Sequence, residues 1–155
     1  VQLQLKQIRQ ILGIRLRSSY EGEAAIALEQ AAGSFPVADP YPWTLSVEGG
    51  IAEIDSRPLI AALAADVESG EMPSGRLAAR FHATVIEAFL ESVRLASRRT
   101  GLRTVALSGG ALQNRILSTR LDSRLAAEGF EVLAQTAVPA NDGGLALGQA
   151  IAALL

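Results

Sequence analysis

The chain has 155 residues, with 14 Lys and Arg against 16 Asp and Glu, so its formal net charge at pH 7 is −2. That length fits one domain or half of a larger one. Cysteine is absent and histidine occurs once, which excludes a disulfide framework, a Cys-ligated metal site, a thiol nucleophile and a multi-His metal site built from this chain alone. Mild acidity and 5% aromatic residues argue against nucleic-acid binding. No apolar stretch approaches the ~18 residues of a membrane span and no targeting segment is visible, so we expect a cytoplasmic protein with no membrane partner.

The first third of the chain predicts two helices and a hairpin. Because Val1 lies inside an amphipathic pattern and Met72 is the only methionine, we expect a fragment of a longer protein. Helical spacing covers residues 1–12 and 22–32. A proline-containing connection then leads to two alternating runs, 43–47 and 51–54, which are separated by Glu48-Gly49-Gly50 and predict a β-hairpin.

The middle of the chain predicts two more helices. Pro58 suits an early helical position, and Gly70 suits the end of the same helix. A longer helix is predicted from about Ser74 to Arg99, where basic residues and Gly101 favour a C-terminus. Its apolar residues recur every four positions, which we expect to place them on one face: Leu77, Phe81, Val85, Phe89 and Val93.

The last third predicts a βαβα unit with a parallel strand pair. Thr104 to Leu107 is a continuous apolar run, typical of a strand buried on both faces. A glycine turn, a helix to about Glu128, a strand over 130–133 and a final helix to Leu155 follow it. The expected fold class is therefore α/β, with a hairpin, a βαβα unit and helices packed on the sheet.

Ser108-Gly109-Gly110 follows the first strand of this unit, where α/β proteins gather ligands. Two glycines allow close backbone approach, the hydroxyl can donate, and a helix N-terminus favours an anion. Phosphate is the ligand that this pattern favours. An ordinary strand-to-helix turn with a serine cap is the alternative.

Two further polar positions belong to the helices of the same unit. Asn114 lies one helical turn beyond Gly110, so its amide could face the turn and reach a ribose or phosphate oxygen; it could equally be an exposed helical residue. Asp142 could bind a cation or a sugar hydroxyl, or act as an N-cap. His82 has no co-ligand and is expected to be structural. Glu21 and Glu23 could reach a ligand or only favour the helix dipole.

Three separated segments resemble one family: residues 19–29 (SYEGEAAIALE), 105–115 (VALSGGALQNR) and 138–149 (VPANDGGLALGQ). They resemble the C-terminal end of the hydrogenase-maturation carbamoyltransferase family, HypF, and Ala79 to His82 resembles its long helix. The resemblance implies an actin-like, ribonuclease H-like lobe that is similar to TsaD. Residues 1–155 would then be the C-terminal lobe of a TsaD-like carbamoyltransferase domain.

The resemblance also implies an activity. The intact protein would make carbamoyl-adenylate from carbamoyl phosphate and ATP in a YrdC-like domain. It would then transfer the carbamoyl group to the C-terminal cysteine of a HypE-like acceptor in nickel-iron hydrogenase maturation. The fragment alone is expected to be inactive, since the acylphosphatase-like, Cys-rich and YrdC-like parts are missing.

Matching the family motifs residue by residue implies a divided site. Gly22 and Asn114 match nucleotide contacts, alongside the turn Ser108, Gly109 and Gly110. Asp142 matches one ligand of a divalent metal, such as iron, zinc or magnesium, whose two histidine ligands would lie outside this fragment. No residue here is expected to be a catalytic nucleophile. Two alternatives stay open: the ATP-binding lobe of a sugar- or acetate-kinase-like phosphotransferase, and a non-catalytic interaction lobe.

Overall fold

The computed structural model describes residues 22–33, 35, 38–135, 137–138 and 142–154. The predicted helix over 1–12 and the position of Glu21 lie outside these residues. The elements follow in chain order: α2 (Glu23–Ala32), β1 (Thr44–Glu48), β2 (Ile51–Asp55), α3 (Arg57–Ser69), α4 (Ser74–Thr100), β3 (Thr104–Leu107), η1 (Gly110–Gln113), α5 (Arg115–Ala127), β4 (Glu131–Ala134), η2 (Asp142–Gly144) and α6 (Leu145–Ala152). The predicted α/β class, hairpin and βαβα unit are confirmed.

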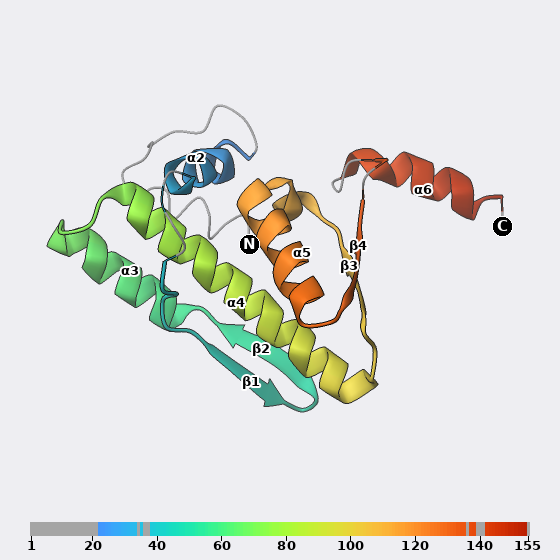
Figure 1. Cartoon of the computed structure of the whole chain (residues 1–155), viewed down its shortest axis with the longest axis horizontal. Coiled ribbons are helices and arrows are strands. Elements are labelled where there is room, and N and C mark those ends of the chain that lie inside the picture. Colours follow the sequence, from blue (N-terminus) through green and yellow to red (C-terminus); the bar gives the residue numbers. More distant parts are fainter. Residues whose placement is uncertain (1–21, 34, 36–37, 136, 139–141, 155) are drawn as a thin grey trace.

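Helix α4 is the axis of the molecule, with α2 and α3 near its first half and α5 near its second (Figure 1). Its first half joins a core with α2 and α3 that contains Leu28, Leu63 and Leu77. Its second half joins a separate core with α5 that contains Leu90 and Leu125. One long helix thus connects two small hydrophobic cores.

The apolar residues of α4 do not share a single face. Leu77 and Phe81 are buried, but Phe89 is 39% exposed. A step of four residues turns a helix by about 400°, so each successive side chain drifts by about 40°. The buried stripe therefore continues on Ile86 and Leu90, and the predicted single face at four-residue spacing was wrong at Phe89.

The hairpin β1–β2 stands largely in solvent. The strands pair antiparallel from Thr44 opposite Asp55 to Glu48 opposite Ile51. Gly49 and Gly50 have φ of 56° and 84°, which is the two-residue turn that matches strand twist. Arg99 Nη1 of α4 donates to the Gly50 carbonyl at 2.8 Å, so the end of the long helix holds the tip of the hairpin.

Strands β3 and β4 are parallel, in register from Thr104 opposite Glu131 to Leu107 opposite Ala134. Val105, Leu107 and Val132 pack against the core of α4 and α5. Thr104 and Ala106 are exposed, so the prediction of a strand buried on both faces was wrong. Among the described residues this sheet has two strands, and helices cover only one of its faces.

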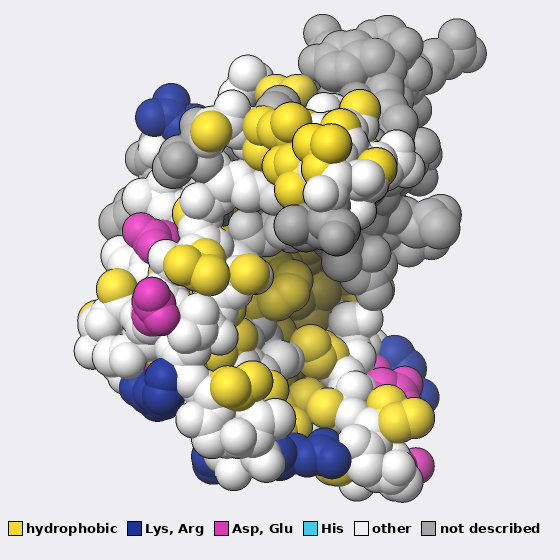
Figure 2. All heavy atoms as spheres, turned by 90° about the vertical axis from the view of Figure 1, so that its right-hand side faces the viewer, with side chains coloured by type: hydrophobic (Ala, Val, Ile, Leu, Met, Phe, Trp, Pro, Cys, Tyr) yellow, Lys and Arg dark blue, Asp and Glu magenta, His cyan; other side chains and the backbone are white. Residues whose placement is uncertain are grey.

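Helix α6 extends away from the helices around α4 (Figure 1), and none of its residues is buried. Leu145, Leu147 and Ile151 are about half exposed or more. Figure 2 shows apolar side chains gathered on the upper part of this side of the molecule, above a hollow that contains further apolar side chains. None of the described helices is both long and apolar enough to cross a membrane.

Candidate functional site

The turn after β3 presents an open backbone. Gly109 has φ 106° and ψ 156°, a conformation that is essentially restricted to glycine. A Cβ atom added to Gly109 or Gly110 would meet nothing within 4 Å. Ser108, Gly109 and Gly110 are all exposed, and the Ser108 hydroxyl accepts a long hydrogen bond of 3.4 Å from Gln135 Nε2, just beyond β4. This edge of the sheet can therefore admit a ligand close to the main chain.

The sequence predicted that Asn114 lies within a helix, but in the structure it does not. The chain forms the short 3-10 helix η1, becomes extended at Asn114 (φ −67°, ψ 114°), and only then enters α5. The Asn114 Oδ1 atom accepts from the Leu117 amide at 3.0 Å, which makes Asn114 the N-cap of α5. The side chain is 8% exposed, so neither the expected exposed residue nor a side chain turned back within one helix is observed.

A buried histidine is the second hydrogen-bond partner of the Asn114 side chain. The distance from Asn114 Nδ2 to His82 Nε2 is 2.9 Å, and that from His82 Nδ1 to the Ala78 carbonyl is 2.8 Å. Since Asn114 Oδ1 already accepts from Leu117, Nδ2 must be the donor to His82. His82 is therefore neutral, with its proton on Nδ1. Burial lowers the pKa of His82, in agreement with this neutral form and with the structural role that the sequence predicted.

The N-terminus of α5 already holds an anion from the chain itself. The Arg115 amide, the first of α5, donates to Glu29 Oε1 of α2 at 2.9 Å. A carboxylate at this position is favoured by the helix dipole. The turn at Ser108 precedes η1 rather than α5. The dipole of α5, which we expected to favour a bound phosphate, therefore favours the Glu29 carboxylate instead. An anion at the turn would rely on the backbone and the Ser108 hydroxyl.

Gly22 lies at the far end of the same helix as Glu29. It has φ 86° and opens α2, and its carbonyl accepts from the Ala25 and Ile26 amides at 2.9 and 3.1 Å. Glu29 lies seven positions after Gly22 along α2, which corresponds to a rise of about 10 Å. Glu23, next to Gly22, is buried. The structure thus joins α2 to the start of α5 through Glu29, a residue that the sequence reasoning missed.

The described residues do not by themselves form a metal site. No three His, Cys, Asp or Glu side chains among them come together in a way that could hold a metal ion. Asp142 begins η2, close in sequence to the end of β4. Both ring nitrogens of His82 are occupied by Ala78 and Asn114, so His82 is not available as a ligand. Any further ligands of a metal at Asp142 would have to come from other residues.

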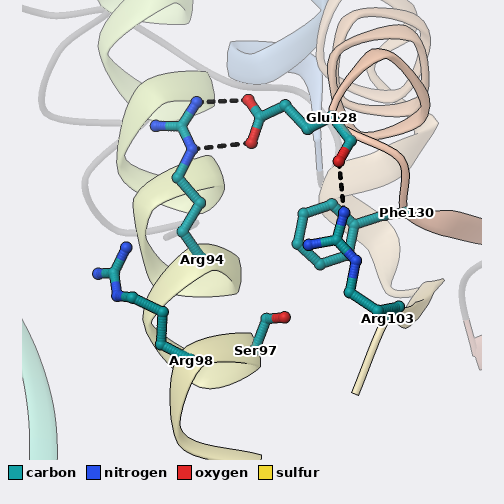
Figure 3. Close-up of a pocket in the computed structure, with 6 residues that line it drawn as sticks. All are labelled: Arg94, Ser97, Arg98, Arg103, Glu128 and Phe130. Atoms are coloured by element: carbon teal, nitrogen blue, oxygen red, sulfur yellow. Dashed lines mark hydrogen bonds and ion pairs between the residues drawn. The ribbon is translucent and has the colours of Figure 1, made fainter. Parts of the chain in front are cut away.

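A pocket of about 190 Å³ lies at the opposite end of β3, lined by Arg94, Ser97, Arg98, Arg103, Glu128 and Phe130 (Figure 3). Arg94 faces the Glu128 carboxylate with two nitrogens, and its Nε atom lies 2.8 Å from Oε2. Arg103 lies 4.0 Å over the Phe130 ring and donates to the Glu128 carbonyl. In the sequence, the signal for these contacts was an acid, Glu128, at the C-terminus of a helix, where the helix dipole disfavours negative charge unless a cation is near.

The geometry defines a class of protein: an α/β lobe whose parallel strand pair ends in an open glycine turn, as in α/β proteins that bind ligands at strand ends. Residues 5–149 match the family described as the carbamoyltransferase Kae1-like domain, second subdomain. The chain belongs to this family of HypF carbamoyltransferases. Carbamoyltransferase HypF of Rhodobacter capsulatus is 45% identical over 139 residues, which cover 89% of this chain and 17% of that protein.

Solved structures agree with this assignment. The crystal structure of a full-length HypF in a phosphate- and nucleotide-bound form matches with a TM-score of 0.87 and 34% identity, over 94% of this chain and 19% of that one. HypF of T. kodakarensis matches with a TM-score of 0.78 and 27% identity, over 96% of this chain and 19% of that one. The chain therefore spans less than a fifth of the length of these three relatives.

Proposed function

We propose that residues 1–155 are the C-terminal lobe of a TsaD-like carbamoyltransferase domain. In the intact protein this lobe would supply half of a nucleotide site for transfer of a carbamoyl group from carbamoyl-adenylate. The acceptor would be the C-terminal cysteine of a HypE-like protein, and carbamoyl phosphate and ATP would be the small-molecule substrates. The observation that carries the proposal is the open Ser108-Gly109-Gly110 turn within the matched family region. The relative with bound phosphate and nucleotide supports it.

The residues of this lobe would bind and orient the adenylate rather than react with it. The amides of Gly109 and Gly110 and the Ser108 hydroxyl are the donors available to the phosphate. The acceptor thiolate would attack the carbamoyl carbon, the bond to the phosphate oxygen would break, and AMP would leave. Asn114 and Gly22 are the remaining proposed nucleotide residues. No covalent nucleophile from this chain is required.

Asp142 is the residue of this lobe that we propose as a ligand of a divalent metal, with the other ligands coming from outside the chain. Carboxylate oxygens suit iron, zinc and magnesium. A metal there would polarise the carbamoyl oxygen as a Lewis acid. Metal content measured by mass spectrometry gives a readout of this role that is independent of activity.

The test uses a chimaera in which this chain replaces the matching segment of the Rhodobacter capsulatus HypF. Carbamoyl transfer is followed by the mass of the acceptor's C-terminal peptide, and adenylate formation by pyrophosphate release. Asp142→Ala should abolish transfer and lower metal content while adenylate formation continues. Asp122→Ala, which changes an exposed acid of α5, is the control and should retain both activities. Unimpaired transfer by Asp142→Ala would overturn the assignment of Asp142.

A further inference from the structure

We propose that His82 is a positioning residue for the nucleotide site, because it holds Asn114 and through it the junction between the glycine turn and α5. This inference rests on the proposed function, since it concerns the same turn. His82 lies in the first half of α4 and is buried, so it would not contact the nucleotide itself. Its effect would pass entirely through the side chain of Asn114.

The hydrogen-bonding capacity of Asn114 limits what this residue can do directly. An asparagine amide offers two N–H donors and one oxygen with two lone pairs. Leu117 uses one lone pair at 3.0 Å and His82 takes one donor at 2.9 Å. One N–H and one lone pair remain, on a side chain that is 8% exposed. Asn114 is thus first a structural cap, and any ligand contact by Asn114 depends on the orientation that His82 sets.

The histidine ring is itself held rigidly. His82 is 2% exposed, and its Nδ1–H donates to the Ala78 carbonyl one turn earlier in α4. The ring meets the Phe81 ring edge to face, with centroids 6.0 Å apart. Because α4 is anchored in both hydrophobic cores, Nε2 is a fixed acceptor. If the Nε2 acceptor is removed, Asn114 keeps a buried N–H donor without a partner. Leaving that donor unpaired costs free energy, which favours rotation of the amide away from its position.

Two substitutions separate the two hydrogen bonds of His82. In His82→Gln the amide oxygen can occupy the region of Nε2 and accept from Asn114. In His82→Asn the shorter side chain can reach the Ala78 carbonyl, near Nδ1, but not Asn114. Thr84→Val is the matched control for a buried polar loss on the same helix, since Thr84 accepts from the Tyr41 amide at 2.7 Å, away from the turn.

The variants are made in the chimaera, and the KM for carbamoyl-adenylate in carbamoyl transfer is measured together with kcat. His82→Asn should raise KM by about tenfold, the equivalent of one lost buried hydrogen bond, with kcat changed by less than about twofold. His82→Gln and Thr84→Val should both stay within about twofold of the parent KM. Equal KM values for His82→Asn and Thr84→Val would overturn the inference, because a purely structural histidine predicts that result.

Amide hydrogen exchange at Leu117, followed by mass spectrometry without nucleotide, separates failure of this inference from failure of the proposed function. Exchange should be faster by about tenfold in His82→Asn and unchanged in His82→Gln. If the parent chimaera shows no transfer dependent on ATP, the proposed function fails, and the exchange result alone decides whether His82 holds the turn. Unchanged exchange in His82→Asn would overturn the positioning role in either case.

Discussion

The two ends of β3 differ in how their polar groups are used. Before the strand, Arg94 and Arg103 meet the carboxylate and carbonyl of Glu128 (Figure 3). After the strand, Ser108 and the two glycines are exposed, and a Cβ atom at either glycine would meet nothing nearby. At one end the polar groups therefore bond to one another and hold α4 and α5 together, whereas at the other end they are accessible to solvent.

Helix α5 connects these ends and explains why one can stay open. Its N-terminus is capped by Asn114 and Glu29, so the open turn is not needed to satisfy the first amides of the helix. Its C-terminal end is fixed by the Arg94–Glu128 pair. A turn that is not needed to cap α5 can adopt the backbone that a ligand needs.

The largest effect should come from the packing that α5 provides between the ends. Leu125 is fully buried near the ion-paired end, and Leu117 is 6% exposed near the turn. Leu125→Ala and Leu117→Ala should each lower the free energy of unfolding by about 2–5 kcal/mol through cavity formation. Urea unfolding followed by circular dichroism measures both. A much smaller loss for Leu117→Ala would mean that α5 is loosely packed near the turn, and would contradict the expectation that α5 is firmly held at both ends.

The second effect should isolate the backbone of the open turn. Gly109→Ala forces a residue with a Cβ atom into φ 106°, ψ 156°, which should lower the free energy of unfolding by about 1–3 kcal/mol. Gly110 has no positive φ and free space around a Cβ, so Gly110→Ala should change it by less than about 0.5 kcal/mol. Thermal unfolding of the two variants checks the contrast, and equal losses would show that the turn relaxes without glycine.

Much of the fold could be predicted from the sequence, because its signals are local. Gly49-Gly50 between alternating runs specifies the hairpin, and Pro58 and Gly70 mark α3. The two failures have different causes. The open face of β3 depends on what covers Ala106, which no local pattern encodes. The exposure of Phe89 follows from helical drift over several turns.

The candidate site was predictable in part, for the same reason. The glycines at 109 and 110 mark a turn wherever they occur after a strand. Contacts between distant residues were not visible: Glu29 reaches Arg115 across 86 positions and His82 reaches Asn114 across 32. These partners convert Asn114 from an expected surface amide into a buried cap.

The smallest effects should distinguish the two ends by pH. Burial lowers the pKa of His82 below its ordinary 6.5, so the unfolded chain binds this proton more readily, and stability at the turn end should begin to fall as pH drops below about 6.5. The Arg94 guanidinium lowers the pKa of Glu128 below its ordinary 4.5. The Arg94–Glu128 pair contributes about 1 kcal/mol to stability, as expected for a partly exposed pair. This contribution is present above about pH 4.5 and is lost as the pH falls through the pKa of Glu128 in the folded chain.

Urea unfolding between about pH 8 and pH 3 should therefore show two separate losses. His82→Gln should remove the loss that begins below about pH 6.5, which no other histidine can cause because the chain has only one. Glu128→Gln should leave that loss intact and reduce the one below about pH 4.5, to which Glu91 and Asp55 also contribute because neighbouring arginines lower the pKa of each. If Glu128→Gln instead changed the loss that begins below about pH 6.5, the two ends of β3 would be coupled through α5. The distinction between an ion-paired end and an open end would then be wrong.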